Sequence, residues 1–203
     1  MQHFLYAFLI ALTNNFDNIG ARIAYSIRGI KISISINLWI SVITFVLSFL
    51  AAFSGKTISG ALGKQFSSII AMVLLTAIGS WMILEPWVKN WRSENRSRGN
   101  LKNISDILLN PEHADMDNSK HIDFKEATLL GIALSLNNVG GGLSAGMLGL
   151  DSFLVGFLSA VLSFAALWAG NYVSSFFIKL KIADKATVAA GLLLIAIGIE
   201  QIL

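Results

Sequence analysis

Cysteine is absent from the 203-residue chain, and charged residues are scarce. The lack of cysteine excludes a disulfide scaffold, a thiolate zinc site and a cysteine nucleophile. Charged residues make up 13% of the chain, about half the roughly 25% share of a soluble domain. The three histidines leave little for zinc or copper chemistry. The basic residues flank apolar runs instead of forming one basic cluster, so we expect no nucleic-acid partner.

Apolar residues dominate the sequence, at 55% of the chain with a mean hydropathy of +0.68. A helix needs about 17 to 25 mostly apolar residues to cross a bilayer. Six stretches approach or meet this length, and we place them at 4–27, 33–53, 66–87, 127–150, 153–176 and 186–203. No basic segment precedes the first stretch, so we interpret it as a helix and not as a cleaved signal peptide. The sequence therefore predicts an all-α membrane protein with six transmembrane helices, and a lipid bilayer as its surroundings.

The polar segment between the third and fourth stretches divides the chain. Residues 88–126 hold seven Lys/Arg, seven Asp/Glu and many Asn and Ser, a composition typical of a flexible, solvated linker. The predicted organisation is a first three-helix unit at 1–90, a linker at 91–125 and a second three-helix unit at 126–203.

Lysine and arginine are distributed unequally between the two sides of the predicted membrane. Thirteen of the fifteen follow the first, third and fifth stretches. By the positive-inside rule these loops are cytoplasmic. We therefore expect a multi-pass protein of a bacterial inner membrane with both termini outside the cytoplasm.

The two three-helix units resemble one another in sequence. A shift of 120 places residues 17–30 on 137–150, so that Asn18 meets Asn138 and Asp17 meets Asn137. A shift of 119 places 67–84 on 186–203 with eight of eighteen residues identical. Because each unit has an odd number of spans, the second must be inverted relative to the first. This is the plan of many secondary transporters, whose binding sites lie near the bilayer midplane.

Polar residues near the centres of the first and fourth spans are the strongest functional signal. An ionised Asp at the bilayer centre costs about 2.5–3.5 kcal/mol on insertion scales, so Asp17 is a site candidate. The polar side chains that could join it are Thr13, Asn14, Asn18, Ser135, Asn137 and Asn138. Close helix approach around them is expected from the glycines Gly20, Gly140, Gly141 and Gly142. Asparagines that only hold helices together are the alternative interpretation.

The ligand atoms of this candidate site are all oxygens, which suits hard cations such as Mg²⁺, Mn²⁺ or Ca²⁺. A metal would be held by Asp17, Asn18, Asn137 and Asn138. The single carboxylate leaves a divalent ion incompletely neutralised. No catalytic acid, base or nucleophile pair occurs within the spans, so we expect no enzyme and no resident cofactor. Glu85, beside Pro86 at the end of the third span, is a secondary candidate.

Three segments carry a resemblance to a known family: NNFDNIGARIAYSIRGIKI at 14–32, GIALSLNNVGGGLSAGMLGL at 131–150 and IGSWMILE at 78–85. Together they resemble the MntP/YtaF group of bacterial membrane proteins, within the LysE transporter superfamily. This resemblance implies a six-span manganese exporter with both termini outside, and it places Glu85 in register with the family pattern. Of the two signature aspartates, the first falls on Asp17 and the second on Asn137. A further acidic position falls on Thr44, which becomes another secondary candidate.

The resemblance implies a small cation as substrate, and two alternatives stay open beside it. One is an exporter of amino acids or other small solutes, as elsewhere in the superfamily. The other is a sporulation membrane assembly protein that transports nothing, as the name of the YtaF branch implies. A homodimer also stays open, because no motif in the chain decides its oligomeric state.

Overall fold

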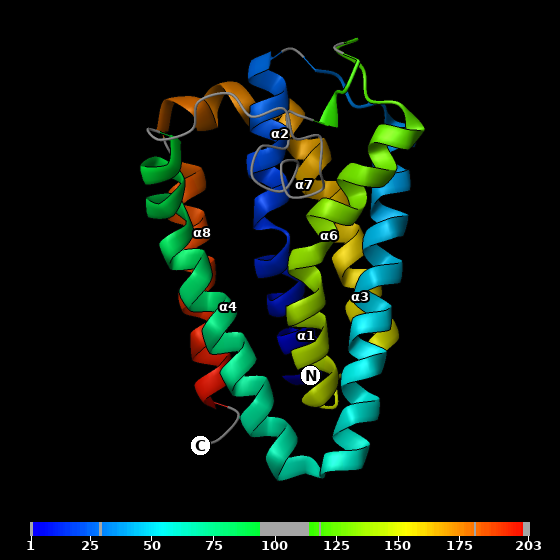
Figure 1. Ribbon diagram of the computed structural model, residues 1–203, viewed down its shortest axis with the longest axis vertical. Coiled ribbons are helices and arrows are strands. Elements are labelled where there is room, and N and C mark those ends of the chain that lie inside the picture. The colour runs from blue at the N-terminus through cyan, green and yellow to red at the C-terminus, as the bar shows by residue number, and fades with distance from the viewer. Residues whose placement is uncertain (1, 29, 94–113, 118, 181, 201–203) are drawn as a thin grey trace.

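The computed structural model describes residues 2–28, 30–93, 114–117, 119–180 and 182–200 (Figure 1). Within the helices, some side chains lie outside this description. The described residues form seven helices, labelled α1–α4 and α6–α8. Their bounds are α1 Gln2–Asn14, α2 Phe16–Arg28, α3 Ile34–Leu62, α4 Lys64–Ser93, α6 Phe124–Met147, α7 Ser152–Leu180 and α8 Ile182–Glu200. No strand occurs in these ranges, and an isolated bridge joins Lys31 to His121. The predicted all-α class is therefore confirmed for this part of the chain.

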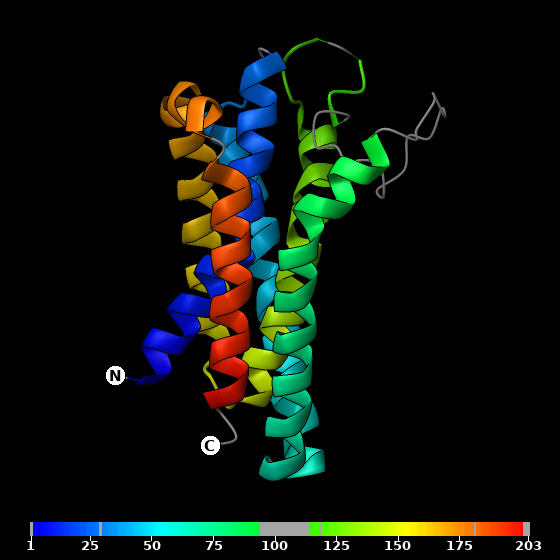
Figure 2. The same ribbon diagram turned by 90° about the vertical axis from the view of Figure 1, so that its left-hand side faces the viewer.

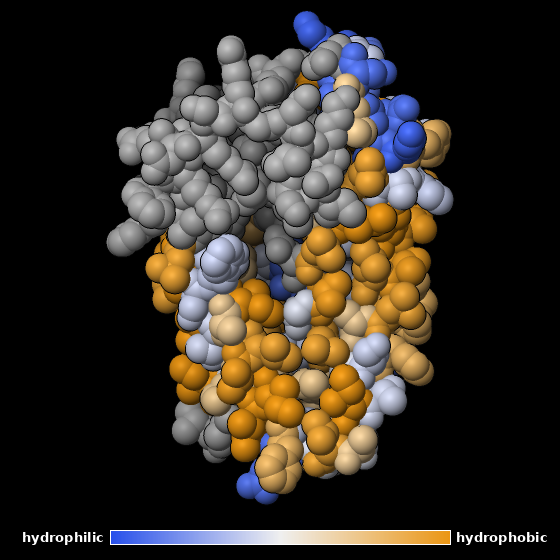
Figure 3. All heavy atoms as spheres, viewed as in Figure 1, coloured by the Kyte–Doolittle hydropathy of each residue, from blue (hydrophilic) through white to orange (hydrophobic). Residues whose placement is uncertain are grey.

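Three of the helices are long and apolar enough to cross a membrane. These segments are Ile34–Leu62, Gln65–Leu84 and Ser152–Ala169. Large apolar side chains such as Val42, Val46 and Leu50 are exposed along α3. Figure 3 shows apolar surface over much of one face of the molecule. In a soluble protein such a surface would be costly, whereas in a bilayer it faces lipid.

Local sequence signals account for several helix ends. The Ser33 side chain accepts a hydrogen bond from the N–H of Ile36 and caps the start of α3, and Gly63, with a φ of 81°, is the cap that follows its last residue. Asp123 and Glu126 form a reciprocal capping box at the start of α6. Gly149, with a φ of 78°, permits the turn between α6 and α7.

The helices pack in a pattern that positions the polar residues. Helix α3 lies against α6 and α7, α4 lies against α8, and α7 also contacts α1 and α2 (Figures 1 and 2). One buried apolar cluster includes Tyr25, Ile40 and Leu130, and a second includes Ile10 and Leu194. In each of three segments, namely α1 with α2, α3, and α6, the buried polar residues lie along the sequence between residues of the first cluster and residues of the second. The arrangement creates a polar layer partway along the bundle.

The first span differs from the predicted single helix over 4–27. It is two helices, α1 and α2, separated by a turn at Asn15. The Asn15 side chain donates to the carbonyl of Ala11 over 2.7 Å, while its main-chain N–H donates to Leu12 over 3.2 Å. The side chain thus takes the carbonyl that the helical N–H would use, a competition that interrupts helices. Figure 2 shows α1 inclined away from the direction of α2.

Part of the predicted flexible linker is ordered. Helix α4 continues to Ser93, and residues 114–123 lie beside the loop that follows α2. The N–H of Lys31 donates to Lys120 over 2.9 Å, and the N–H of Ile122 donates to Lys31 over 3.3 Å. Ala114 and Ile122 are buried in the apolar cluster around Tyr25. The interpretation of the whole 88–126 segment as a solvated linker was therefore wrong at both ends.

Candidate functional site

A hydrogen-bonded network of buried side chains links the two halves of the chain. The Asn18 amide donates to Asn15 Oδ1 and to Ser163 Oγ, both over 2.9 Å. The Thr44 hydroxyl lies 3.4 Å from Ser163 Oγ and 3.0 Å from Ser135 Oγ. All five side chains are at most 2% exposed. Residues from the first span, α3, α6 and α7 therefore meet at one buried polar layer.

Asn138 lies in the same layer but has a different environment. Its side chain is 1% exposed, and neither its Oδ1 nor its Nδ2 has a hydrogen-bond partner among the described residues. A buried polar group without a partner costs about 1–3 kcal/mol. Both the oxygen and the N–H groups of this amide are therefore available to a water or a ligand.

Two more unpartnered oxygens belong to residues that contact the face of α6 on which Asn138 lies. Within the described part of the chain, Asn14 Oδ1 and Ser48 Oγ are buried without a hydrogen-bond partner. The Asn14 amide lies against Gly141, and the backbone of Ser48 lies against Gly142. Gly141 and Gly142 are three and four residues after Asn138, so they share its helix face. Asn14, Ser48 and Asn138 therefore form a group of unpartnered polar side chains, which we call the open amide site.

The glycines of α6 make this close approach feasible. A Cβ on Gly141 would overlap the Asn14 amide, and a Cβ on Gly142 would lie 3.0 Å from Ala51 Cβ. Gly140 faces a different neighbour, since its Cβ would meet Ile78 Cδ1 of α4 at 2.6 Å. Gly141 is thus the glycine whose small size admits a site side chain. The Gly20 environment lies outside the described residues.

The remaining sequence candidates fall into two groups. Thr13 is buried, and its hydroxyl is 3.0 Å from Leu9 O and 2.9 Å from Ile10 O, so it bonds to its own helix. Asp17, Glu85 and Asn137 lie in α2, α4 and α6 respectively, but their side chains are outside the described set. The structure therefore joins Asn18, Thr44 and Ser135 in one network and buries Asn14 and Asn138, while the placement of the two acids and of Asn137 stays a prediction.

Sequence reasoning missed Asn15, Ser48 and Ser163. Serines in apolar helices are common and often bond to their own backbone, so they stand out little. For Ser163 a signal did exist, because the shift of 119 that aligns the third and sixth spans also places Thr44 on Ser163. These two residues lie 3.4 Å apart in the structure.

A separate acidic group lies at the end of the bundle that holds residues 114–123. Ligand oxygens of Asp115, Asp117 and Glu126 fall within 4.8 Å of one another. Backbone N–H groups already occupy them: Met116 donates to Glu126 over 2.7 Å, and Ser119 donates to Asp115 and Asp117 over 3.0 and 2.9 Å. Hydrogen bonds from Ser119 lower the pKa of the Asp117 carboxyl. These carboxylates thus help to fix the backbone conformation around Met116 and Ser119 through hydrogen bonds.

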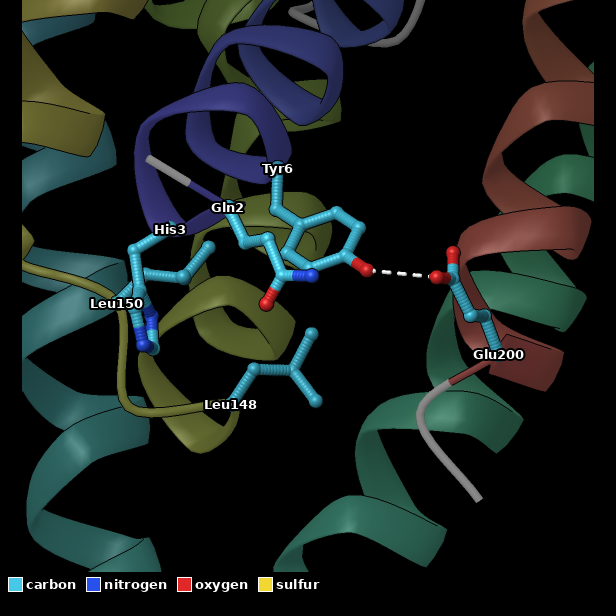
Figure 4. Close-up of a pocket in the computed structure, with 6 residues that line it drawn as sticks. All are labelled: Gln2, His3, Tyr6, Leu148, Leu150 and Glu200. Carbon is cyan, nitrogen blue, oxygen red and sulfur yellow. Dashed lines mark hydrogen bonds between the residues drawn. The ribbon is translucent and has the colours of Figure 1, made fainter. Parts of the chain in front are cut away.

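A pocket of about 250 Å³ lies at the other end of the bundle, between the two ends of the chain (Figure 4). Its polar residues are Gln2, His3, Tyr6 and Glu200, and two leucines complete it. The Tyr6 hydroxyl donates to Glu200 Oε1 over 2.8 Å. The contact joins α1 to α8 at the mouth of this pocket.

Comparison with known proteins supplies the family. The family model described as "Putative manganese efflux pump" matches residues 27–203. The chain is 28% identical over 203 residues to "Probable sporulation protein YtaF" of Bacillus subtilis, covering 96% of this chain and 97% of that protein. It is 27% identical over 146 residues to "Putative manganese efflux pump MntP" of Clostridium perfringens strain 13, covering 69% of this chain and 64% of that protein.

No solved structure matches the chain. The family model nevertheless covers both halves of the sequence, including the whole of α3, α6 and α7, which carry Thr44, Ser135 and Ser163; Asn15 and Asn18 precede the matched residues. The long apolar helices agree with a membrane location. The chain is a multi-pass helical membrane protein and belongs to the MntP family.

Proposed function

We propose that this protein is a secondary transporter that exports a small cation, of the Mn²⁺-like divalent class, through the polar layer. The open amide site carries this proposal, because it presents buried oxygens with no partner among the described residues. Such oxygens suit hard cations. The name of the C. perfringens relative and of the family model supports manganese as the first ion to test.

The proposed architecture is two inverted repeats of three spans, in which α1 and α2 together form one span. Its support lies in the contacts: α3 packs on α6 as α7 packs on α1 and α2, while α3 pairs with α7 and α4 with α8. Exchanging the first three spans with the last three reproduces this set of contacts. The Thr44 and Ser163 pair, related by the same exchange, lies at its centre. In repeats of this kind the substrate site lies at their interface.

Asp17 is the proposed charge of the site. It follows the break at Asn15 by two residues and precedes Asn18 by one. One carboxylate cannot neutralise a divalent ion, so the amide and hydroxyl oxygens must supply the remaining stabilisation. If protons are the counter-ion, Asp17 is protonated when the cation leaves and deprotonated when it binds.

The proposed orientation places both termini outside the cytoplasm in a bacterial inner membrane. Gln2 and Glu200 line one pocket, so the two ends of the chain share one end of the bundle. Lys31 and residues 114–123 lie at the opposite end (Figure 1). The excess of basic residues in the loops assigned to that opposite end supports its placement in the cytoplasm.

The test is cation uptake into proteoliposomes that contain the wild type or Asp17→Asn. The panel is Mn²⁺, Mg²⁺, Ca²⁺ and Zn²⁺, and Asp117→Asn is the control because Asp117 is exposed outside the bundle. We expect one ion to be transported by the wild type and the control, and not by Asp17→Asn. Transport that is insensitive to Asp17→Asn would contradict the proposed role of the carboxylate.

A second candidate is a sporulation membrane protein that transports nothing. The B. subtilis relative supports it through its name and its coverage of nearly the whole chain. This candidate predicts no transport of any ion in the panel and a requirement for the 95–120 segment instead. Deleting that segment in a spore-forming host and counting heat-resistant spores separates the two proposals.

A further inference from the structure

Asn18 and Asn138 occupy matched positions in the two halves but are bonded differently. The shift of 120 relates them, and both are buried, at 0% and 1% exposure. Asn18 donates to Asn15 and Ser163. Asn138 has no partner for either polar atom among the described residues. The polar layer is therefore asymmetric although its sequence is nearly symmetric.

The side chains that would serve Asn138 are bonded to each other instead. The counterparts of Asn15 and Ser163 are Ser135 and Thr44, by the shifts of 120 and 119. Ser135 and Thr44 lie 3.0 Å apart, Oγ to Oγ1. In the first half, Asn18 is thus hydrogen-bonded to both of its partners. In the second half, the two corresponding residues bond to each other and not to Asn138.

The backbones of the two spans differ in the same way. The first span is interrupted at Asn15, and α1 leans away beside the pocket lined by Gln2, His3 and Tyr6 (Figures 2 and 4). In the fourth span, α6 runs without interruption through Ser135, the matched position. At the start of α6, Ile122 is 5% exposed in the apolar cluster. Among the described residues, a pocket therefore lies at the terminal end of the bundle, whereas Ile122 is buried at the opposite end.

We propose that Asn18 and Asn138 take turns as the substrate-binding amide of an alternating-access cycle. In the conformation described, Asn138 binds substrate and Asn18 is held by protein. In the opposite conformation α1 and α2 form one straight helix, α6 is interrupted at Ser135, Asn138 donates to Ser135 and Thr44, and Asn18 is released. This inference rests on the proposed transport function and assigns the group that binds in each state.

The open amide site also defines the form in which a cation binds. Oxygens of Asn14, Ser48 and Asn138 can face an ion, but the Nδ2 of Asn138 is a donor and cannot. A water kept by the ion can accept from that donor, and Mg²⁺-like ions retain several waters. The site therefore takes a partly hydrated cation.

The natural absence of cysteine makes the exchange testable with single-cysteine reporters in the full chain. Leu148→Cys reports on the terminal pocket, which Leu148 lines, and Ile122→Cys reports on the opposite end. Each reporter is combined with Asn18→Leu, Asn138→Leu or, as a matched control, Asn37→Leu. Asn37 is a buried asparagine that donates to Phe164 O over 3.1 Å. Maleimide labelling rates are measured in proteoliposomes without added metal.

Asn18→Leu removes bonds made only in the conformation described, so labelling at position 122 should rise and that at position 148 should fall. A bond worth about 1 kcal/mol corresponds to about a fivefold change in the ratio of the two rates. Asn138→Leu removes bonds made only in the opposite conformation, so it should shift the ratio the other way, and Asn37→Leu should leave it unchanged. If either leucine variant is not monodisperse in detergent, Asn18→Ser and Asn138→Ser replace the pair.

Equal shifts in the same direction for the Asn18 and Asn138 variants would overturn the exchange. So would a ratio that neither variant moves. Because labelling needs no substrate, opposite shifts without Mn²⁺ transport would retain the exchange and refute the cation proposal. Mn²⁺ transport without opposite shifts would refute the exchange and retain the cation proposal.

Discussion

The side-chain amide of Asn14 lies directly against Gly141, so α1 and α6 meet at a point where a methyl group has no room. Asn14 belongs to the open amide site, and its position depends on this absent side chain. A change at Gly141 therefore acts on the site without altering any of its polar groups.

We expect Gly141→Ala to displace Asn14 and to reduce transport by at least tenfold, since small displacements of binding groups have large effects. The control is Gly60→Ala, because a Cβ at that helical glycine meets nothing within 4 Å. Initial uptake rates of Mn²⁺ in proteoliposomes measure both variants. Wild-type uptake by Gly141→Ala would show that Asn14 does not need its present position.

Gly146 sets the distance between α3 and α6. A Cβ there would overlap the backbone carbonyl of Ala52, which cannot move aside as a side chain can. Gly146→Ala should destabilise the protein by about 1–3 kcal/mol or more, as overpacking does. The comparison is Gly140→Ala, whose Cβ would meet only the flexible tip of Ile78. Thermal unfolding in detergent should rank the two, and equal melting temperatures would contradict this account of the contact.

Asn15 is the residue that interrupts the first span. Asn15→Ala removes the side chain that occupies the Ala11 carbonyl and replaces it with the best helix former. We expect α1 and α2 to become more nearly collinear. Spin labels on cysteines at positions 8 and 26 should move apart in pulsed electron resonance measurements. A distance distribution identical to that of the wild type would mean that packing, and not Asn15, bends the span.

Glu126 holds residues 114–123 in place through both carboxylate oxygens. Oε1 accepts from Met116 N over 2.7 Å and Oε2 accepts from Asp123 N over 3.1 Å. Glu126→Gln keeps one acceptor and places a donor against the other N–H, so this segment should loosen. Hydrogen exchange at the Met116 and Asp123 amides should become several-fold faster, whereas Asp117→Asn should leave both unchanged. Unaltered exchange in Glu126→Gln would indicate that the apolar contacts of Ile122 suffice.

The sequence was a good guide wherever a residue type conflicted with its surroundings. Asn14, Asn18 and Asn138 stood out because amides are costly in an apolar span, and the structure buries all three and places Gly141 against Asn14, while their role in binding stays a prediction. Ser48 and Ser163 were missed because a serine can satisfy itself within its own helix. The interruption at Asn15 was missed because Asn14 and Asn15 are also compatible with an unbroken helix that presents two polar ligands.

The ordered end of the linker was missed for another reason. Its composition is polar, and composition predicts solvation well when no partner is near. Here the partners are Lys31 and the apolar cluster around Tyr25, which lie far from this segment in the sequence and which only folding brings close. Non-local contacts of this kind leave no local pattern in the sequence.

The glycine contacts between α3 and α6 also limit which part of α6 can swing. Gly142 and Gly146 hold the second half of that helix against the backbone of α3, whereas Gly131 in the first half lies mainly against the Ile43 side chain. In the proposed exchange, a bend at Ser135 therefore disturbs only the looser of these contacts. The movable arm is then residues 124–134, about 16 Å long by helix rise. In the proposed exchange its counterpart is α1, so two segments of similar length would move, one at each end of the bundle.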